Sequence, residues 1–176
     1  MESLLLIRPT AEYAEEIAAY REEFLRCGSS MDGCGPLRRI ADPLEYLAET
    51  ERYTREETLP EGKVLATQFF YVRQSERKIV GMLQVRHYFN EYLEKYAGHI
   101  GYSVRPSERR KGYAKRMLRD ALPFCRELGL EKVLITCDED NEGSRRTILA
   151  NGGVYESTVF EPEEGLVIQR YWIRLK

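Results

Sequence analysis

The sequence has few of the residues that build metal sites and disulfide frameworks. Its 176 residues include two histidines and four cysteines. No two cysteines have the C-x-x-C spacing typical of structural zinc sites, and two histidines cannot complete one. Two of the cysteines lie in strongly apolar runs typical of a core. We therefore expect no metal, and reduced structural thiols at Cys27, Cys34, Cys125 and Cys137.

An excess of one charge and a long apolar run are also absent. Lys and Arg number 27 against 29 Asp and Glu, so the chain lacks the basic excess of a dedicated nucleic-acid-binding protein. The start has only four consecutive apolar residues behind an acidic second residue, which fits neither a signal peptide nor a membrane span. We expect one cytoplasmic domain, residues 1–176, with no nucleic acid and no membrane as partner.

The pattern along the chain predicts an α/β (α+β) protein of about seven strands and about four helices. Apolar alternation and β-branched runs predict strands, while helical spacing, N-caps and glycine stops predict helices. The expected strands are residues 4–7, 64–73, 78–88, 99–104, 132–137, 154–160 and 166–174, and the expected helices are residues 11–25, 42–57, 112–128 and 141–151.

Three local features predict departures from regular structure. Gly101 inside an expected strand suggests a β-bulge. Pro123 inside an expected helix removes the hydrogen bond to the Arg119 carbonyl and predicts a bend. Residues 27–36 are rich in glycine and polar residues and show no core pattern, so we expect them to form the most mobile loop.

The segment from Tyr102 to Ala114 carries the clearest chemical signal. It has the pattern of a strand end, a short basic loop and a helix start. Unsatisfied amides at a helix N-terminus attract anions, and Gly112 lets the backbone approach closely. We expect this loop to bind the phosphates of a nucleotide-like cofactor. A solvated basic loop is the alternative, and no G-x-G-x-x-G or P-loop fingerprint is present. The basic side chains here are Arg109, Arg110, Lys111 and Lys115.

Here the sequence resembles the GNAT superfamily of N-acetyltransferases. The signature [Gln/Arg]-x-x-Gly-x-[Gly/Ala] is matched by residues 109–114, and residues 103–106, Ser-Val-Arg-Pro, match the strand ending that precedes it. Residues 98–153 further resemble an uncharacterised bacterial group of predicted acetyltransferases. The resemblance implies a central mixed, mostly antiparallel sheet with splayed strands that form an acetyl-CoA cleft. It implies acetyl transfer to a primary amine, with acetyl-CoA as cosubstrate.

The resemblance also implies roles for individual residues. The backbone N–H of Val104 would hold the oxyanion of the tetrahedral intermediate. Many members carry a tyrosine as general acid seven residues after the helix-start asparagine, where this chain has Ile148. A thiol of pKa about 8.5 leaves with little proton assistance. Cofactor contacts are implied for Tyr102, Ser103, Val104, Arg109, Arg110, Lys111, Gly112, Tyr113, Ala114, Lys115, Asn141 and Ser144.

Candidates for the acceptor side each have a structural alternative. His87 and His99 could act as the base that deprotonates the amine, or make structural hydrogen bonds. Asp138 and its acidic neighbours could relay the proton, or cap and solvate the next helix. Tyr155 and residues 170–172 could line the acceptor pocket, or pair across strands. We expect residues 27–57 to flank the acceptor entrance. Five glutamates there, which could also be a solvated face, favour a cationic acceptor: Glu45, Glu49, Glu51, Glu56 and Glu57.

Two other functions remain open at this point. The missing tyrosine is compatible with a non-catalytic acyl-CoA-binding or sensor protein. The seven basic residues between Arg105 and Arg119 could form a nucleic-acid patch, which the net acidity of the chain disfavours. The acceptor, a small molecule or a peptide, and the choice between monomer and homodimer are not determined by the sequence.

Overall fold

The computed structural model describes residues 2–176 and shows two antiparallel sheets. Strands β1 (Leu4–Ile7), β2 (Ala66–Arg73), β3 (Lys78–Arg86) and β4 (Ile100–Val104) form the first sheet in that order. The second has the order β5-β7-β6, with β5 (Lys132–Asp138), β6 (Val154–Glu161) and β7 (Leu166–Arg174). The expected α/β fold of seven strands is thereby confirmed.

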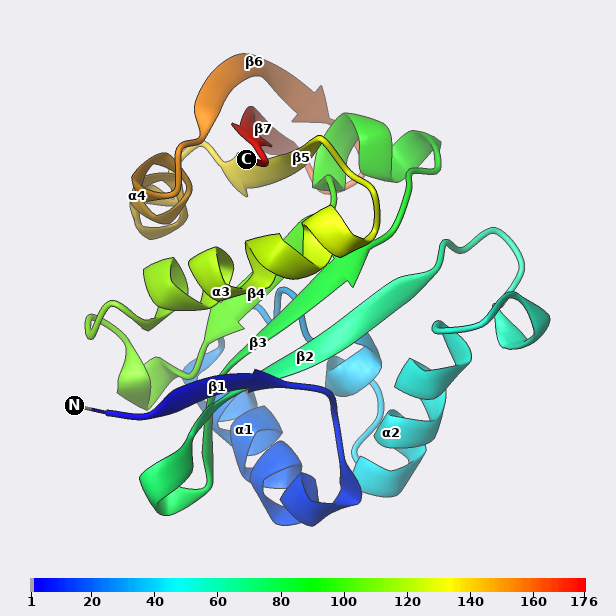
Figure 1. Ribbon diagram of the computed structural model, residues 1–176, viewed down its shortest axis with the longest axis vertical. Helices are drawn as coiled ribbons and strands as arrows, with labels where there is room; N and C mark the ends of the chain where they lie inside the picture. Colours follow the sequence, from blue (N-terminus) through cyan, green and yellow to red (C-terminus); the bar gives the residue numbers. More distant parts are fainter. Residues whose placement is uncertain (1) are drawn as a thin grey trace.

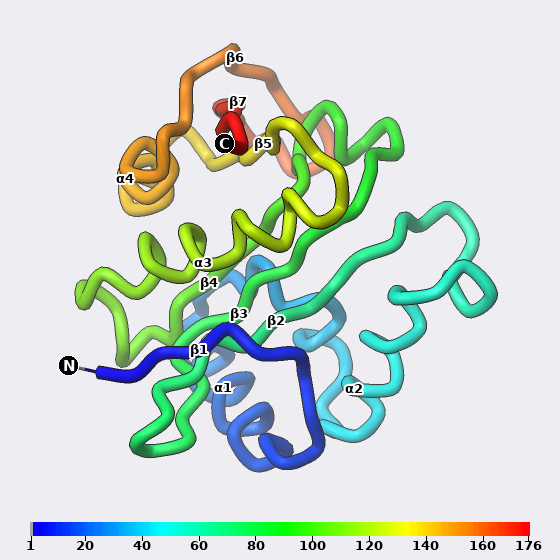
Figure 2. Tube along the Cα trace, in the orientation of Figure 1, coloured from blue at the N-terminus to red at the C-terminus, as the bar shows by residue number. Residues whose placement is uncertain are grey.

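Helix α3 (Tyr113–Glu127) lies between the two sheets, as Figure 1 shows. Helices α1 (Ala14–Cys27) and α2 (Pro43–Arg52) cover the opposite face of the four-stranded sheet, and α4 (Glu142–Ala150) lies beside β5. Figure 2 places the N-terminal end at β1 and the C-terminal end at β7, so each belongs to a different sheet. Short 3-10 helices are η1 (Ala11–Tyr13), η2 (Gly35–Arg38), η3 (Glu56–Thr58), η4 (Gln74–Glu76) and η6 (Pro106–Glu108), and η5 (Leu93–Ala97) is a short π-helix.

Strand β2 shows why the four-stranded sheet is covered on both sides. All eight of its residues are buried, because successive side chains point to opposite faces. Phe69 and Tyr71 pack in the cluster that includes α3. Phe70 and Val72 pack in the cluster that includes α1. The alternation thus builds one core on each face of the sheet.

The two sheets meet at one point and then diverge. Gly98 forms an isolated bridge with Ile135, and His99 N donates to Leu134 O at 2.8 Å. Beyond this point β4 and β5 belong to separate sheets. This separation is the splay that the family resemblance implies.

Two expectations for the strands and helices were wrong. Gly101 pairs regularly with Gln84 and forms no bulge; its missing side chain instead lets the backbone of Gly33 pack against it. The second helix ends at Arg52 rather than near residue 57, because the Thr54 and Thr58 hydroxyls take up the carbonyls of Glu51 and Arg52.

The expectation that residues 27–36 lack core residues was also wrong. Cys34 is fully buried, and an added Cβ at Gly33 would overlap the Gly101 carbonyl. Helix α3 runs without interruption through Pro123, from Tyr113 to Glu127; the bend expected there stays a prediction. Within residues 2–176, no helix has the length and apolar character needed to cross a membrane.

Candidate active site

Strand β4 presents a free backbone edge to the gap between the sheets. Arg105 N donates to Val80 O at 2.8 Å across the β3–β4 pair. Hydrogen-bonding direction alternates along an antiparallel strand, so the N–H groups of Val104 and Tyr102 point to the other edge. The Val104 carbonyl accepts from Arg109 Nε at 3.0 Å on that side. An acyl group lying along this edge could therefore receive a hydrogen bond from Val104 N–H.

The loop from β4 to α3 is held on one side by α1. Arg105 donates to Glu23 at 2.6 Å and to Glu16 at 3.0 Å. The other oxygen of Glu23 accepts from Ser107 N at 2.6 Å. These bonds outweigh the effect of partial burial and lower the pKa of Glu23. The start of the loop is thus fixed before any ligand arrives.

On its other side the loop is held by a buried carboxylate, Glu108. Its oxygens accept from Arg73 at 2.8 and 3.2 Å, from Lys111 at 2.8 Å and from Lys78 at 3.0 Å. The hydrogen bonds from Arg73 hold the pKa of Glu108 far below its usual range. Arg73 also donates to Tyr113 Oη at 3.0 Å. Lys111 and Tyr113 therefore belong to the support of the loop.

The turn into α3 leaves its first amides free. Gly112 is the N-cap with φ +79°, and no side chain caps the helix. Arg116 N donates to Gly112 O, so the amides of residues 113–115 precede the first helical bond. Arg110 also has a left-handed backbone, with φ +64°. These free amides are able to bind an anion, and the exposed Arg110 and Lys115 lie next to them.

Across the gap, the start of α4 is tied to β4. The Asn141 side chain accepts from Ser144 N at 3.1 Å and caps α4. Tyr102 Oη and Ser144 Oγ lie 2.7 Å apart. Burial raises the pKa of Tyr102 well above its usual range, so this phenol stays protonated. Tyr102, Asn141 and Ser144 thereby come together on the two walls of the gap.

Several expected cofactor residues point elsewhere. The Ser103 hydroxyl lies 2.9 Å from Tyr20 Oη and 3.3 Å from Cys34 Sγ, on the α1 face of the sheet. Ala114 contributes its backbone to the first turn of α3. Arg109 reaches back to Ser29 Oγ at 2.9 Å and lies over the Phe24 ring.

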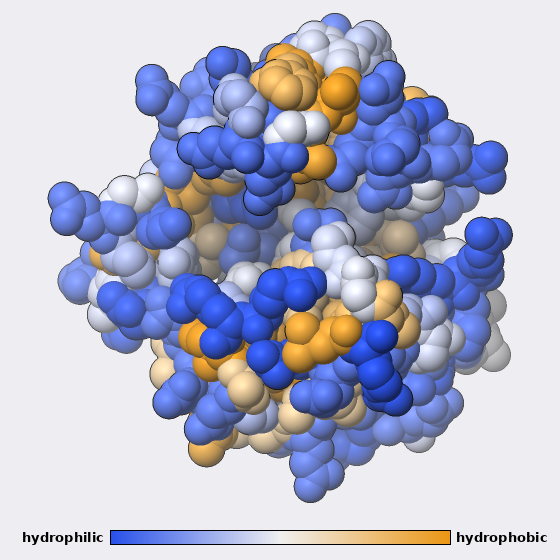
Figure 3. All heavy atoms as spheres, turned by 180° about the vertical axis from the view of Figure 1, so that it is seen from behind, coloured by the Kyte–Doolittle hydropathy of each residue, from blue (hydrophilic) through white to orange (hydrophobic). Residues whose placement is uncertain are grey.

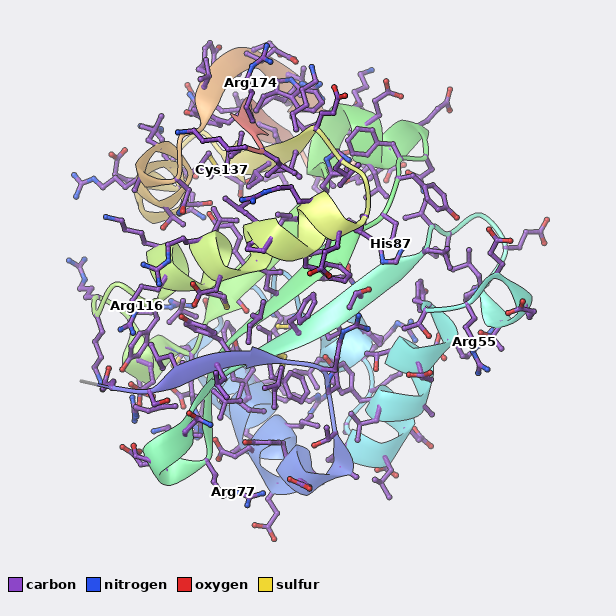
Figure 4. All side chains as sticks on the ribbon, in the orientation of Figure 1. Arg55, Arg77, His87, Arg116, Cys137 and Arg174 are labelled. Carbon is purple, nitrogen blue, oxygen red and sulfur yellow. The ribbon has the colours of Figure 1, made fainter. Side chains whose placement is uncertain are left out.

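Both histidines make structural contacts. His99 Nδ1 accepts from Leu134 N at 2.9 Å, so the neutral ring carries its proton on Nε2. Burial lowers the pKa of His99 to about 4. His87 lies 2.8 Å from Thr67 Oγ1 and packs edge-on against Phe124, at the end of α3 remote from Gly112 (Figure 4). Burial and the Arg8 charge lower the pKa of His87.

Two carboxylates lie near the mouth of the gap. Asp138 ends β5 and is half-buried. Burial and the charge of nearby Asp32 raise its pKa, in the direction that a general base needs. Asp32 comes from the loop after α1, and sequence reasoning missed it. No motif marks this residue, because its position depends on Gly33 packing against Gly101.

A cavity of about 390 Å³ opens on the α2 side of the first sheet. Figure 3 shows that the face opposite Figure 1 is hollowed between the parts of the molecule, with mostly hydrophilic residues around the hollow. The residues from α2 that line it include Thr50 but none of the five glutamates named for this region. The lining consists of Gly35, Pro36, Arg39, Thr50, Tyr53, Lys63, Val64, Ala66, Gln68, Gln84, Arg86, Asn90, Tyr92 and Leu93.

The hairpin formed by β6 and β7 is held by contacts between its own side chains. Arg170 donates to Glu156 at 2.8 Å, and Trp172 Nε1 donates to the same carboxylate. Tyr155 is exposed and packs edge-on against Tyr171. Arg170 also borders a second, more open hollow beside η5.

Ile148, at the position of the family tyrosine, is fully buried in the core and contributes no polar group.

The family model described as the acetyltransferase (GNAT) family matches residues 36–152, which include the β4–α3 loop and the start of α4. The chain belongs to the GNAT acetyltransferase family. This membership supports the assignment of the protein as an acetyl-CoA-dependent acyltransferase. A search of curated protein sequences gave no significant match.

Solved structures of acetyltransferases share this fold. The ribosomal-protein-S5-alanine acetyltransferase from Vibrio fischeri is 17% identical with a TM-score of 0.76, and the match covers 100% of this chain and 95% of that one. The microcin C7 self-immunity acetyltransferase MccE, solved with acetyl-CoA and AMP, is 19% identical with a TM-score of 0.70, covering 97% and 92%. An N-acetyltransferase from Staphylococcus aureus Mu50 is 15% identical with a TM-score of 0.67, covering 99% of both chains.

Proposed function

We propose that the protein transfers the acetyl group of acetyl-CoA to a primary amine of a small molecule or peptide, by direct attack in a ternary complex. The observation that carries the proposal is the free edge of β4, which leads directly into the uncapped amides of α3. In this arrangement the pyrophosphate lies on residues 109–115. The pantetheine arm runs along β4 toward Val104, with Tyr102, Asn141 and Ser144 on the walls of the gap.

Placement and electrostatics supply the chemistry. The amine, held beside the thioester, attacks the carbonyl carbon, and Val104 N–H donates to the oxygen that becomes negative. Asp138, with its raised pKa and with Asp32 nearby, accepts the amine proton directly or through water. His99 is unsuited to this role, because its Nδ1 is occupied by Leu134 N and its Nε2 carries the proton.

The departing CoA sulfur needs little help. A thiol of pKa about 8.5 leaves largely as thiolate near neutral pH, so a buried Ile148 at the position of the family tyrosine is compatible with turnover. Ser103 takes no part through its side chain, which is bonded to Tyr20 and Cys34.

The proposal is tested by a matched pair of glycine variants. Gly112→Asp places a carboxylate at the phosphate turn, and we expect acetyl-CoA affinity to fall by at least about tenfold in calorimetric titrations. Gly129→Asp is the control: Gly129 has φ +86° at the other end of α3, and an added Cβ meets nothing within 4 Å at either glycine. Both substitutions strain the backbone alike, but only the first lies at the proposed site.

Equal affinity of the two variants for acetyl-CoA would contradict this placement of the cofactor. Thiol release is then followed with a panel of amines. If acetyl-CoA binds tightly but no amine causes thiol release, the protein is a non-catalytic acyl-CoA-binding protein. The buried Ile148 is the observation that favours this alternative.

A further inference from the structure

The cavity beside α2 carries charge of only one sign. Its charged lining residues are Arg39, Lys63 and Arg86, and no aspartate or glutamate lines it within residues 2–176. None of the three cations forms an ion pair with a carboxylate in the described part of the chain; Arg73 in β2 and Arg105 just after β4 are both paired. No carboxylate in the cavity wall neutralises these three positive charges, so the electrostatic potential inside the cavity is positive.

Arg86 is the inner cation of the cavity. Its guanidinium donates to the carbonyls of Ala97 and Gly98 at 3.2 and 3.3 Å, and its Nη2 would lie 3.1 Å from a Cβ added at Gly101. Burial lowers the pKa of Arg86 to about 10, and Asp32 opposes this only at longer range. Arg86 is partly exposed, and a guanidinium bonded only to carbonyls retains donors and a charge that an anion would satisfy.

Gln68 is a buried residue of the cavity lining, and one of its polar atoms lacks a hydrogen-bond partner. Gln68 Nε2 donates to Gly33 O at 2.7 Å and to Leu83 O at 3.2 Å, which fixes the orientation of the amide. Its Oε1 is the buried side-chain acceptor without a hydrogen bond among residues 2–176. Native proteins rarely leave such an atom unsatisfied. An N–H donor of a ligand would complete it.

We propose that the acceptor amine carries an anionic group, a carboxylate or a phosphate, that binds Arg86, Arg39 and Lys63 in this cavity while a ligand N–H donates to Gln68 Oε1. This inference rests on the proposed acetyl transfer and names its substrate class. It replaces the cationic acceptor that the acidic residues around α2 favoured, since those residues lie outside the lining.

The fold sets the distance between the two ends of such a ligand. Gln84 lines the cavity and is the cross-strand partner of Gly101. Val104, the proposed oxyanion donor, lies three residues further along β4, or about 10 Å at the rise of a strand. An acceptor with several bonds between amine and anion spans this distance, so a short peptide with a free C-terminus fits better than a single amino acid.

The experiment compares amines that differ only in the anion. Thiol release from acetyl-CoA is measured with trialanine and its C-terminal amide, and with 6-aminohexyl phosphate and 6-aminohexanol; the pairs separate carboxylate from phosphate. We expect kcat/KM to be at least about tenfold higher for an anionic member than for its neutral partner. In the double variant Arg39→Gln, Lys63→Gln, at two exposed positions, KM for that member rises about tenfold while kcat is retained.

Arg55→Gln is the matched control. Arg55 is exposed, lies outside the cavity lining and points away from the molecule in Figure 4, so we expect unchanged kinetics. Arg86→Met is measured as well, with circular dichroism as a check on folding. Equal kcat/KM for neutral and anionic amines, or equal effects of the double variant on both, would overturn the inference and leave acetyl transfer standing.

A binding measurement separates the inference from the proposed function. Trialanine and its amide are titrated calorimetrically into the protein saturated with CoA. Selective binding of the anion that the double variant loses supports the inference even where no thiol is released. Equal binding of both, or binding of neither, overturns it. If the protein fails to bind acetyl-CoA, only the proposed function is contradicted. Inorganic phosphate is then titrated into the wild type and the double variant. Binding that the double variant loses supports the inference, and equal binding or none overturns it.

Discussion

His99 is the residue at which the two sheets are joined, and its chemistry follows from that position. Its N–H and its Nδ1 both bond the backbone of Leu134, and its ring packs against Phe89 at 4.1 Å between centroids. A proton on Nδ1 would break the bond from Leu134 N. The folded structure therefore requires the neutral form of the His99 ring.

Because the fold requires neutral His99, the free energy of unfolding decreases as the pH falls. The folded-state pKa of His99 is lowered from 6.5 to about 4, so between these values the unfolded chain binds more protons. The stabilisation is complete above pH 6.5 and is lost as the pH falls toward 4. We expect the Tm in scanning calorimetry to fall over this range. His99→Asn keeps an acceptor for Leu134 N without titrating, and should flatten the decline; an unchanged decline would show that other groups cause it.

At single residues, sequence reasoning predicts a local conformation where one segment holds the whole signal. Gly112 was expected at the start of a helix and is the N-cap of α3; that Gly112 and Arg109 bind the cofactor stays a prediction. Asp32, Gln68 and Arg86 come from three segments, and they lie in one region because Gly33 packs on Gly101. Cys34 was assigned to a loop without core residues, yet it is buried against Ser103, because burial there depends on the neighbouring sheet rather than on local apolar pattern.

Among the elements, the loop between β4 and α3 depends most on its neighbours. It is fixed by Glu23 from α1 and by Arg73 from β2. Periodicity predicted the flanking strand and helix, but not that two carboxylates hold the turn between them. The end of α2 was missed for a related reason: threonine hydroxyls beyond Arg52 compete for its last carbonyls.

Removing the buried carboxylate should destabilise this loop. Glu108→Gln leaves Arg73, whose side chain is 8% exposed, without its main counter-charge, and breaking a buried pair costs about 3 kcal/mol or more. We expect that loss in urea unfolding at neutral pH, with weaker acetyl-CoA binding. Because the pKa of Glu108 is lowered, the difference from wild type should shrink as the pH falls below 4.5, where the unfolded chain takes up the proton.

Glu142→Gln is the control for that measurement. Glu142 pairs with Arg145 and Arg146 on the exposed face of α4, and its side chain is 53% exposed. Surface pairs contribute less than about 1 kcal/mol. Similar losses in the two variants would contradict the special role assigned to Glu108.

For the whole molecule, the thiols report on the two cores. Cys34 lies in the core on the α1 face, while Cys125 and Cys137 lie in the core around α3. Burial raises the pKa of Cys34 and of Cys125 to about 12 and that of Cys137 to about 11, and the thiolate is the reactive form. Cys27 is exposed.

We therefore expect a thiol reagent at pH 7.5 to label Cys27 at once and the other three thiols only after unfolding. Cys27→Ser should abolish the fast labelling, as measured by mass spectrometry. If both cores open together in denaturant, the three slow thiols become reactive at one denaturant concentration. Rapid labelling of Cys34 in the native protein would contradict the packing of the loop after α1.

The cavity and the cofactor loop are built from successive stretches of the chain. Residues lining the cavity lie between Gly35 and Leu93, whereas the phosphate turn and the far wall of the gap lie between Tyr102 and Ser144. In evolutionary terms, drift or recombination in the first stretch can change the preferred acceptor while the second stretch keeps its cosubstrate. A designer can exploit the same division by grafting residues 27–97 from a relative onto an unaltered cofactor-binding half.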